Sequence, residues 1–463
     1  MHYQPLLMRN HLFFLLMICA FCNVCKAQEQ PYVYKPFTND LNEAKKIQGI
    51  ITERLNGQIT AAPATFKKET IDIYKTRHKS IENLATEKYI ITEKKAVAYL
   101  QQLVNEIVDN NKHLLVTPVT VMFLKDENPN AACYGEGIIF FNLGLFTRLD
   151  NESEVAFVIS HELAHHYFEH SNKSIARYVN TLYAKETQDR LKQINNKEFG
   201  RNADLQKLAQ GLSFTHSRHS RDHEKEADSL ALVFLKNTKF NTAAAITTLQ
   251  LLDTIDHETF DAVTFEKQVF NFADAPFKQK WTRKEEGIFG GHAVLTRDSI
   301  LSDSLKTHPD CQVRIKALQS LVNAGEGKPK SPINLSLFAE LKNDFAYELI
   351  AHYINEEMYS QSLYHSLALL SKKTNDAYAI TATGLAFSNM YAAGKAHRLG
   401  AVKEMPSPAQ PPLYNLHLQF LENLSLNDIA NIGYNFLSQY QNTLSFYGEY
   451  NTTLNKCKKN IEN

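Results

Sequence analysis

The segment His161-Glu162-Leu163-Ala164-His165 constrains the fold of this chain more than any other, because its chemistry requires a helix. Residues i and i+4 of an α-helix lie on one face, so both imidazoles can point at one ion. Neutral imidazole nitrogen is a good Zn²⁺ ligand, and Glu162 would reach a metal-bound water as general base. Asn151, with Glu154 three residues later, resembles a capping box and predicts a helix from there to about His170.

A zinc site that also holds water needs a third protein ligand. His170 follows His161 by nine residues rather than ten, and Phe stands at position 168, so the pattern with a third histidine does not apply. His166 and His170 are compatible with a solvated, histidine-rich helix face. The third ligand must then come from a distant part of the chain.

The segment SRDHEKEAD, residues 220–228, offers that ligand. Glu224 and Asp228 are one helical turn apart, on one face of a second helix. Glu224 can complete the zinc site, and Asp228 can accept a hydrogen bond from a ligand imidazole and so set its tautomer. Taken alone, the segment is also compatible with an ordinary charged helix face.

Composition and charge exclude several classes of protein. The chain has 463 residues, 44% hydrophobic and 22% charged, which is typical of globular proteins. At roughly 150 residues per domain, this length suggests about three domains. Fifty basic residues balance 50 acidic ones, which argues against a nucleic-acid partner. The one long apolar run is at the N-terminus, which excludes a multi-spanning membrane protein.

The N-terminus predicts a secretory signal peptide that is removed after Ala27. Arg9 precedes the apolar run 12–21, and the small residue Ala27 fits the cleavage position. A buried N-terminal helix or a single anchor is the alternative. The mature chain would have no transmembrane span and would keep three cysteines, too few for a disulfide framework: Cys133, Cys311 and Cys457.

The remaining pattern predicts an α+β fold, a mainly helical domain with a small β-sheet followed by an all-α region. The expected parts are a signal peptide (1–27), an extended and helical segment (28–90), a metal-binding domain (91–323) with a helical insert (172–220), a linker (324–334) and a helical C-terminal region (335–463). Similar segments begin at residues 343 and 375, 32 residues apart. They leave open a tetratricopeptide-like array or a plain helical bundle.

HELAH followed by SRDHEKEAD resembles the zinc metallopeptidases of family M48, of the HtpX and BepA type, which also include the CAAX prenyl endopeptidases. The resemblance covers about residues 90–322. Further matches are Asn130-Ala131 before the glycine-bearing strand, and Thr307-His308-Pro309 followed by Arg314 and Leu318. It implies a zincin fold of the gluzincin type with one Zn²⁺ per chain, bound by His161, His165 and Glu224, and with Glu162 catalytic.

His308 is expected near the open position of the metal. Pro309 restricts it to extended geometry, and the resemblance implies that a histidine in this context can approach the metal. It would hold the enzyme latent as a fourth ligand, or donate a hydrogen bond to the developing oxyanion. A surface histidine beside a helix start is the alternative.

The function expected is that of a secreted zinc endopeptidase acting on unfolded proteins or peptides, in which zinc-activated water attacks the peptide bond. Its expected location is the periplasm, with a role in envelope protein quality control, and an extracellular location is the alternative. The strand containing Gly137, Ile138, Ile139 and Phe140 is expected to be an edge that aligns substrate by β-augmentation, with the insert 172–220 as its cover. The alternative is a non-enzymatic chaperone or scaffold that binds unfolded envelope proteins through its C-terminal helices. A zinc hydrolase of non-peptide substrates is a third class.

Overall fold

The computed structural model describes residues 33–283, 311–323 and 332–462, apart from residues 87, 116, 198–199, 256 and 408–409. The signal peptide predicted at 1–27 and His308 lie outside the described residues. The elements are α2 (Leu41–Thr60), α3 (Lys67–Thr86), α4 (Lys94–Asp109), β1 (Thr120–Leu124), β2 (Ala131–Cys133), β3 (Ile138–Asn142), α5 (Leu143–Phe146), α6 (Glu152–Tyr167), α7 (His170–Tyr183), α8 (Lys185–Asn195), α9 (Arg201–Lys236), α10 (Ala244–Thr254), α11 (Ala262–Val269), η1 (Gln279–Thr282), α13 (Cys311–Asn323), α14 (Leu335–Asn355), α15 (Tyr359–Leu370), α16 (Ala377–Lys395), α17 (Leu399–Val402), α18 (Pro412–Glu422), α19 (Leu426–Ser438), α20 (Gln441–Leu444) and α21 (Gly448–Glu462). The mainly helical α+β class is confirmed.

The small sheet has the strand order β1-β3-β2, with β1 parallel and β2 antiparallel to β3. The prediction that the strand of residues 137–140 forms an edge is therefore wrong, because β3 pairs on both sides. Its physical reason is visible in the sequence: β3 is an unbroken apolar run and all five residues are buried, as in a strand covered on both faces. The edge strand beside it is the short β2.

Both faces of the sheet are covered by helices. Ile138 and Phe140 of β3 pack against α2 and α3, where Ile51 is fully buried. Ile139 and Phe141 point the other way, because successive side chains of a strand alternate, and they join the main core with α4, α6 and α9. The helix α6 is thereby held close to the sheet.

Helix α6, which carries the HELAH segment, is buried over most of its length, including polar residues such as Ser160 and His161. Asn151 caps it, accepting hydrogen bonds from the N–H groups of Ser153 and Glu154 at 3.0 and 3.1 Å. Glu154 accepts from the N–H of Asp150 at 2.7 Å rather than from Asn151. In a capping box the Glu154 side chain would accept from the N–H of the N-cap residue Asn151. Here it accepts from the residue before, Asp150.

We expect Asn151→Ala to lower the free energy of unfolding by about 1 kcal/mol, the typical cost of losing an N-cap side chain. The urea midpoint of the full chain measures this loss. Asn110→Ala, at the C-terminal end of α4, removes an exposed amide that only bonds its own helix and should change the midpoint much less. Equal midpoints for Asn151→Ala and the wild type would contradict the capping role.

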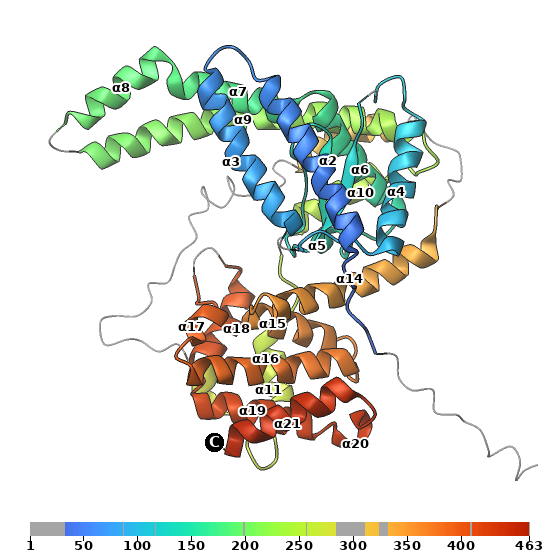
Figure 1. Ribbon diagram of the computed structural model, residues 1–463, viewed down its shortest axis with the longest axis vertical. Coiled ribbons are helices and arrows are strands. Elements are labelled where there is room, and N and C mark those ends of the chain that lie inside the picture. Colours follow the sequence, from blue (N-terminus) through green and yellow to red (C-terminus); the bar gives the residue numbers. More distant parts are fainter. Residues whose placement is uncertain are drawn as a thin grey trace, which may run out of the picture.

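The chain has two large hydrophobic cores, and each contains residues from both sides of the predicted linker. Helix α14 lies beyond the linker but packs into the main core through Phe338, Phe345 and Leu349. In the opposite direction, Phe270 and Trp281, which precede the linker, belong to the core of the C-terminal helices. Figure 1 shows α14 between the two parts and α11 among the C-terminal helices.

The two similar segments of the C-terminal region do not occupy equivalent positions. Asp344 lies within α14, whereas Asp376 is the N-cap of α16. The 32-residue spacing therefore does not mark a structural repeat at these two segments. Helix α16 packs instead against α15, α19 and α21, so the region is built around one buried central helix.

Within the part of the chain that is described, no helix combines the length and apolar character needed to cross a bilayer. The predicted insert consists of α7, α8 and the first half of α9, and Figure 1 shows α8 and the start of α9 as a pair that projects from the body. The other end of α9 returns to pack beside α6. This helix therefore delivers Glu224 and Asp228 to the HELAH segment.

Candidate metal centre

Helices α6 and α9 bring together the three residues predicted as metal ligands. One ligand atom each from His161, His165 and Glu224 lies within 4.8 Å of the others. The Nε2 atoms of the two histidines are 3.0 Å apart. The Glu224 carboxylate oxygens lie 3.5 Å from His161 Nε2 and 3.3 Å from His165 Nε2. The i, i+4 spacing on α6 and the packing of α9 against it produce this convergence.

The second nitrogen of each imidazole faces a residue outside the cluster. His161 Nδ1 lies 2.9 Å from Asp228 Oδ1, and His165 Nδ1 lies 2.9 Å from His170 Nδ1. A neutral imidazole that donates from Nδ1 has its lone pair on Nε2, so both lone pairs face the Glu224 carboxylate. Two imidazoles, one carboxylate and room for water are a typical donor set of catalytic zinc. The residues present therefore fit Zn²⁺.

Arg314 of α13 contacts both Asp228 and Glu224 of α9. Its guanidinium donates to both oxygens of Asp228, at 2.6 and 2.7 Å, and its Nη1 lies 3.0 Å from Glu224 Oε2. Only 3% of the Arg314 side chain is exposed. Such a fork fixes the plane of a carboxylate as well as its charge.

The charge balance keeps both α9 carboxyl groups ionised. Burial alone would raise the pKa of Asp228, but hydrogen bonds from Arg314 and His161 lower it below its ordinary value. Burial acts likewise on Glu224, and its contacts with His161 and His165 bring its pKa well below the usual range. Ionised carboxylates are what a metal ligand and its supporting acceptor both require.

Glu162 lies next to the ligand pair and beside the edge strand. It is buried, and its Oε2 accepts a hydrogen bond from the Cys133 N–H of β2 at 2.7 Å. Burial raises the pKa of Glu162, against the opposing effect of His165 and His161. A carboxylate whose pKa is shifted toward neutrality is better matched to proton transfer at neutral pH than an exposed one.

Sequence reasoning missed three features of this site. Arg314 was named only as one of the matches to the family, and its position in the sequence did not show which residues it contacts. The edge strand was placed on β3, although the short segment Ala131–Cys133 was the better candidate. His170 was compatible with a solvated, histidine-rich helix face, whereas its side chain is buried.

We expect Asp228→Ala to weaken zinc binding about 10- to 100-fold without abolishing it, because His161 loses the acceptor that sets its tautomer. Competition with a chromogenic chelator measures the affinity. Asp228→Asn keeps an oxygen acceptor for His161 and should lose less. Zinc affinity and activity equal to those of the wild type in Asp228→Ala would contradict this supporting role.

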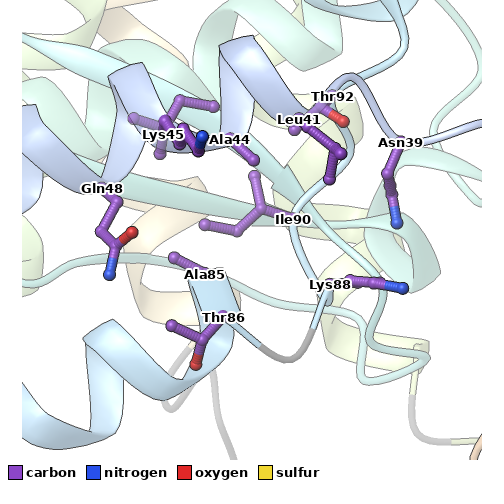
Figure 2. A pocket seen from close by; sticks show the side chains of 11 residues that line it. Asn39, Leu41, Ala44, Lys45, Gln48, Ala85, Thr86, Lys88, Ile90 and Thr92 are labelled. Carbon is purple, nitrogen blue, oxygen red and sulfur yellow. The ribbon is translucent and has the colours of Figure 1, made fainter.

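A pocket of about 180 Å³ lies elsewhere, between α2, the end of α3 and the segment before α4. Figure 2 shows Leu41 and Ile90 in its lining, with Lys45 and Lys88. None of the residues that line it belongs to the His161, His165 and Glu224 cluster. This pocket is therefore not the candidate active site.

Comparison with known proteins places the His161, His165 and Glu224 cluster within a peptidase family match. The model of peptidase family M48 matches residues 94–322, about half of the chain, which contain every residue of the cluster. The chain belongs to peptidase family M48. The family predicted from the HELAH and SRDHEKEAD segments is thereby confirmed.

A relative of this family-M48 chain occurs in Vibrio cholerae serotype O1, under the provisional name beta-barrel assembly-enhancing protease. The two are 32% identical over 155 residues, which make up 31% of this chain and 31% of the relative. The chain therefore matches about a third of the length of that relative. The similarity extends to part of the chain only, and the name describes the relative.

Proposed function

We propose that this chain is a zinc-dependent endopeptidase of the bacterial cell envelope that hydrolyses unfolded proteins. The observation that carries the proposal is the convergence of His161, His165 and Glu224, with Glu162 buried beside them. Family membership supports peptide-bond hydrolysis as the reaction. The predicted signal sequence and the named relative support the envelope as the location.

A zinc ion bound by His161, His165 and Glu224 would lower the pKa of its water to about 7 and polarise the scissile carbonyl. The Glu162 carboxylate would take a proton from the water that attacks this carbonyl, and would return it to the nitrogen of the leaving amine. Cys133 N–H holds one oxygen of Glu162 and so orients the carboxylate. Asp228 and Arg314 keep His161 and Glu224 in position.

The edge strand β2 is the proposed guide for the substrate. Ala132 and its even-numbered neighbours bond to β3, so the main-chain groups of Ala131 and Cys133 point away from β3. The Cys133 N–H donates to Glu162, which leaves the main-chain groups of Ala131 and the carbonyl of Cys133 for a substrate. An extended peptide added along this edge would have its backbone close to Glu162, which Cys133 contacts. Backbone pairing tolerates many sequences, which suits unfolded proteins as substrates.

Metal-dependent digestion tests the proposal. The full chain without residues 1–27 should degrade reduced, carboxymethylated lactalbumin, lose this activity after treatment with 1,10-phenanthroline, and regain it when Zn²⁺ is restored. A chain that suppresses aggregation of the same protein but never cleaves it, with zinc bound, would favour the non-enzymatic chaperone instead. Cleavage that persists in the chelator-treated chain, shown to be free of metal, would also contradict the proposal.

A further inference from the structure

His170 is a buried histidine that contacts a proposed metal ligand but cannot itself reach the metal position. Its Nδ1 lies 2.9 Å from His165 Nδ1, and its Nε2 lies 3.1 Å from Glu226 Oε2. The side chain is 5% exposed, whereas that of Glu226 is 57% exposed. His165 Nε2 faces the opposite way, toward His161 and Glu224.

The chain bends sharply to bring His170 there. Helix α6 ends at Tyr167 with Phe168 as its C-cap, and Glu169 adopts a left-handed conformation with φ 54°, which is uncommon for a residue other than glycine. His170 then begins α7. The bend returns His170 toward His165, which a continuous helix would not do, because a separation of five positions corresponds to about 140° of rotation.

Two rings hold the His170 imidazole in plane. The ring of His223, from α9, stacks on it with centroids 4.0 Å apart and planes 10° apart. The ring of Phe168 lies at 5.3 Å and 20°. His170 thus has a fixed orientation that does not depend on its hydrogen bonds alone.

The hydrogen-bond chain is consistent with one arrangement of protons once a metal occupies His165 Nε2. His165 must then carry its proton on Nδ1 and donate it to His170 Nδ1, which accepts through its lone pair. His170 in turn carries its proton on Nε2 and donates it to Glu226. Each ring nitrogen in this chain is then either a donor, an acceptor or a metal ligand, and no two N–H groups point at each other.

We propose that His170 is a positioning residue that fixes the tautomer and ring orientation of His165 for metal binding, with Glu226 as the outer acceptor. The inference rests on the proposed function, because His165 needs such a positioning residue only if it is a metal ligand. The two histidines of the HELAH segment then have different supports. His161 is held by the carboxylate of Asp228, which Arg314 fixes, and His165 is held by an imidazole.

Two substitutions separate hydrogen bonding from packing. His170→Phe keeps a ring between Phe168 and His223 but removes the acceptor for His165. His170→Asn loses the stacked ring but places an amide oxygen near the former Nδ1 position. Removing the outer support of a metal-bound histidine typically weakens metal affinity about 10- to 100-fold, so His170→Phe should raise the zinc Kd by this factor. His170→Asn should retain most of the affinity.

The zinc Kd is measured on the full mature chain by competition with a fluorescent chelator, beside His166→Phe as matched control. His166 neighbours His165 but bonds Thr117, so its variant should bind zinc like the wild type. If His170→Phe bound zinc like the wild type and His170→Asn bound it more weakly, His170 would act through packing. That result would overturn this inference but not the proposed function. Unchanged zinc affinity in both variants would do the same. A wild-type chain without zinc affinity would overturn the proposed function as well.

Discussion

Glu162→Gln is expected to lower the rate of peptide-bond cleavage about 100- to 10,000-fold while the chain keeps its zinc. This range is typical of the contribution of one general acid–base group. The amide oxygen of Gln can still accept the hydrogen bond from Cys133 N–H, so the edge strand should keep its place. Gln cannot take up the proton that the carboxylate removes. Initial rates on an unfolded test protein, at equal zinc content, measure the effect.

Glu186→Gln is a matched control for this substitution, because Glu186 is exposed on α8 and belongs to none of the contacts described at the site. Its rate should equal that of the wild type. Cleavage by Glu162→Gln at more than about one tenth of the wild-type rate would assign the proton transfer to another group. Loss of zinc from this variant would instead make Glu162 part of the metal binding.

Arg314→Leu is expected to lower the free energy of unfolding by about 3–5 kcal/mol, the cost of leaving a buried charge without its partner. Asp228 and Glu224 both lie against this guanidinium, and Asp228 is 1% exposed. The substitution would leave two neighbouring carboxylates with one positive group fewer. Urea denaturation of the chelator-treated chain measures the loss without a contribution from zinc.

Arg398→Leu serves as control for Arg314→Leu, because Arg398 pairs with Glu357 at a distance of 3.5 Å while both side chains are more than half exposed. Exposed pairs of this kind contribute about 0–1 kcal/mol. Arg314→Lys keeps a positive charge but not the fork on Asp228, and an intermediate loss is expected. Equal unfolding midpoints for Arg314→Leu and Arg398→Leu would show that the buried ion cluster is not needed for stability.

Local patterns allowed the helix that carries the HELAH segment to be predicted, whereas contacts between distant segments did not follow from the sequence. The i, i+4 spacing depends only on helix geometry, so His161 and His165 could be paired from the sequence alone. Glu224 was proposed because the site lacked a third ligand and a second helix offered one. The position of Arg314 depends on the packing of α13 against α9, which is not a local property. The contact between His170 and His165 could not be predicted, because the left-handed residue Glu169 interrupts the helical period between them.

Burial explains the remaining differences in the fold. The apolar run of β3 was predicted to be an exposed edge, although a run without polar alternation is typical of a strand covered on both faces. Helix α14 follows a stretch with the composition of a linker, yet its aromatic residues complete the main core. A linker composition marks a break in the chain pattern, but it does not show which core the next helix joins.

The zinc content of the purified chain without residues 1–27 tests the central claim most directly. Mass spectrometry of the metal should find one zinc per chain in the wild type and in Glu162→Gln, and less than a tenth of that in a variant with both His161 and His165 replaced by Ala. Glu224→Ala should lose zinc to a chelator that leaves the wild type loaded. A double-histidine variant that retains one zinc per chain, or a wild-type chain that digests unfolded protein without any metal, would contradict the account.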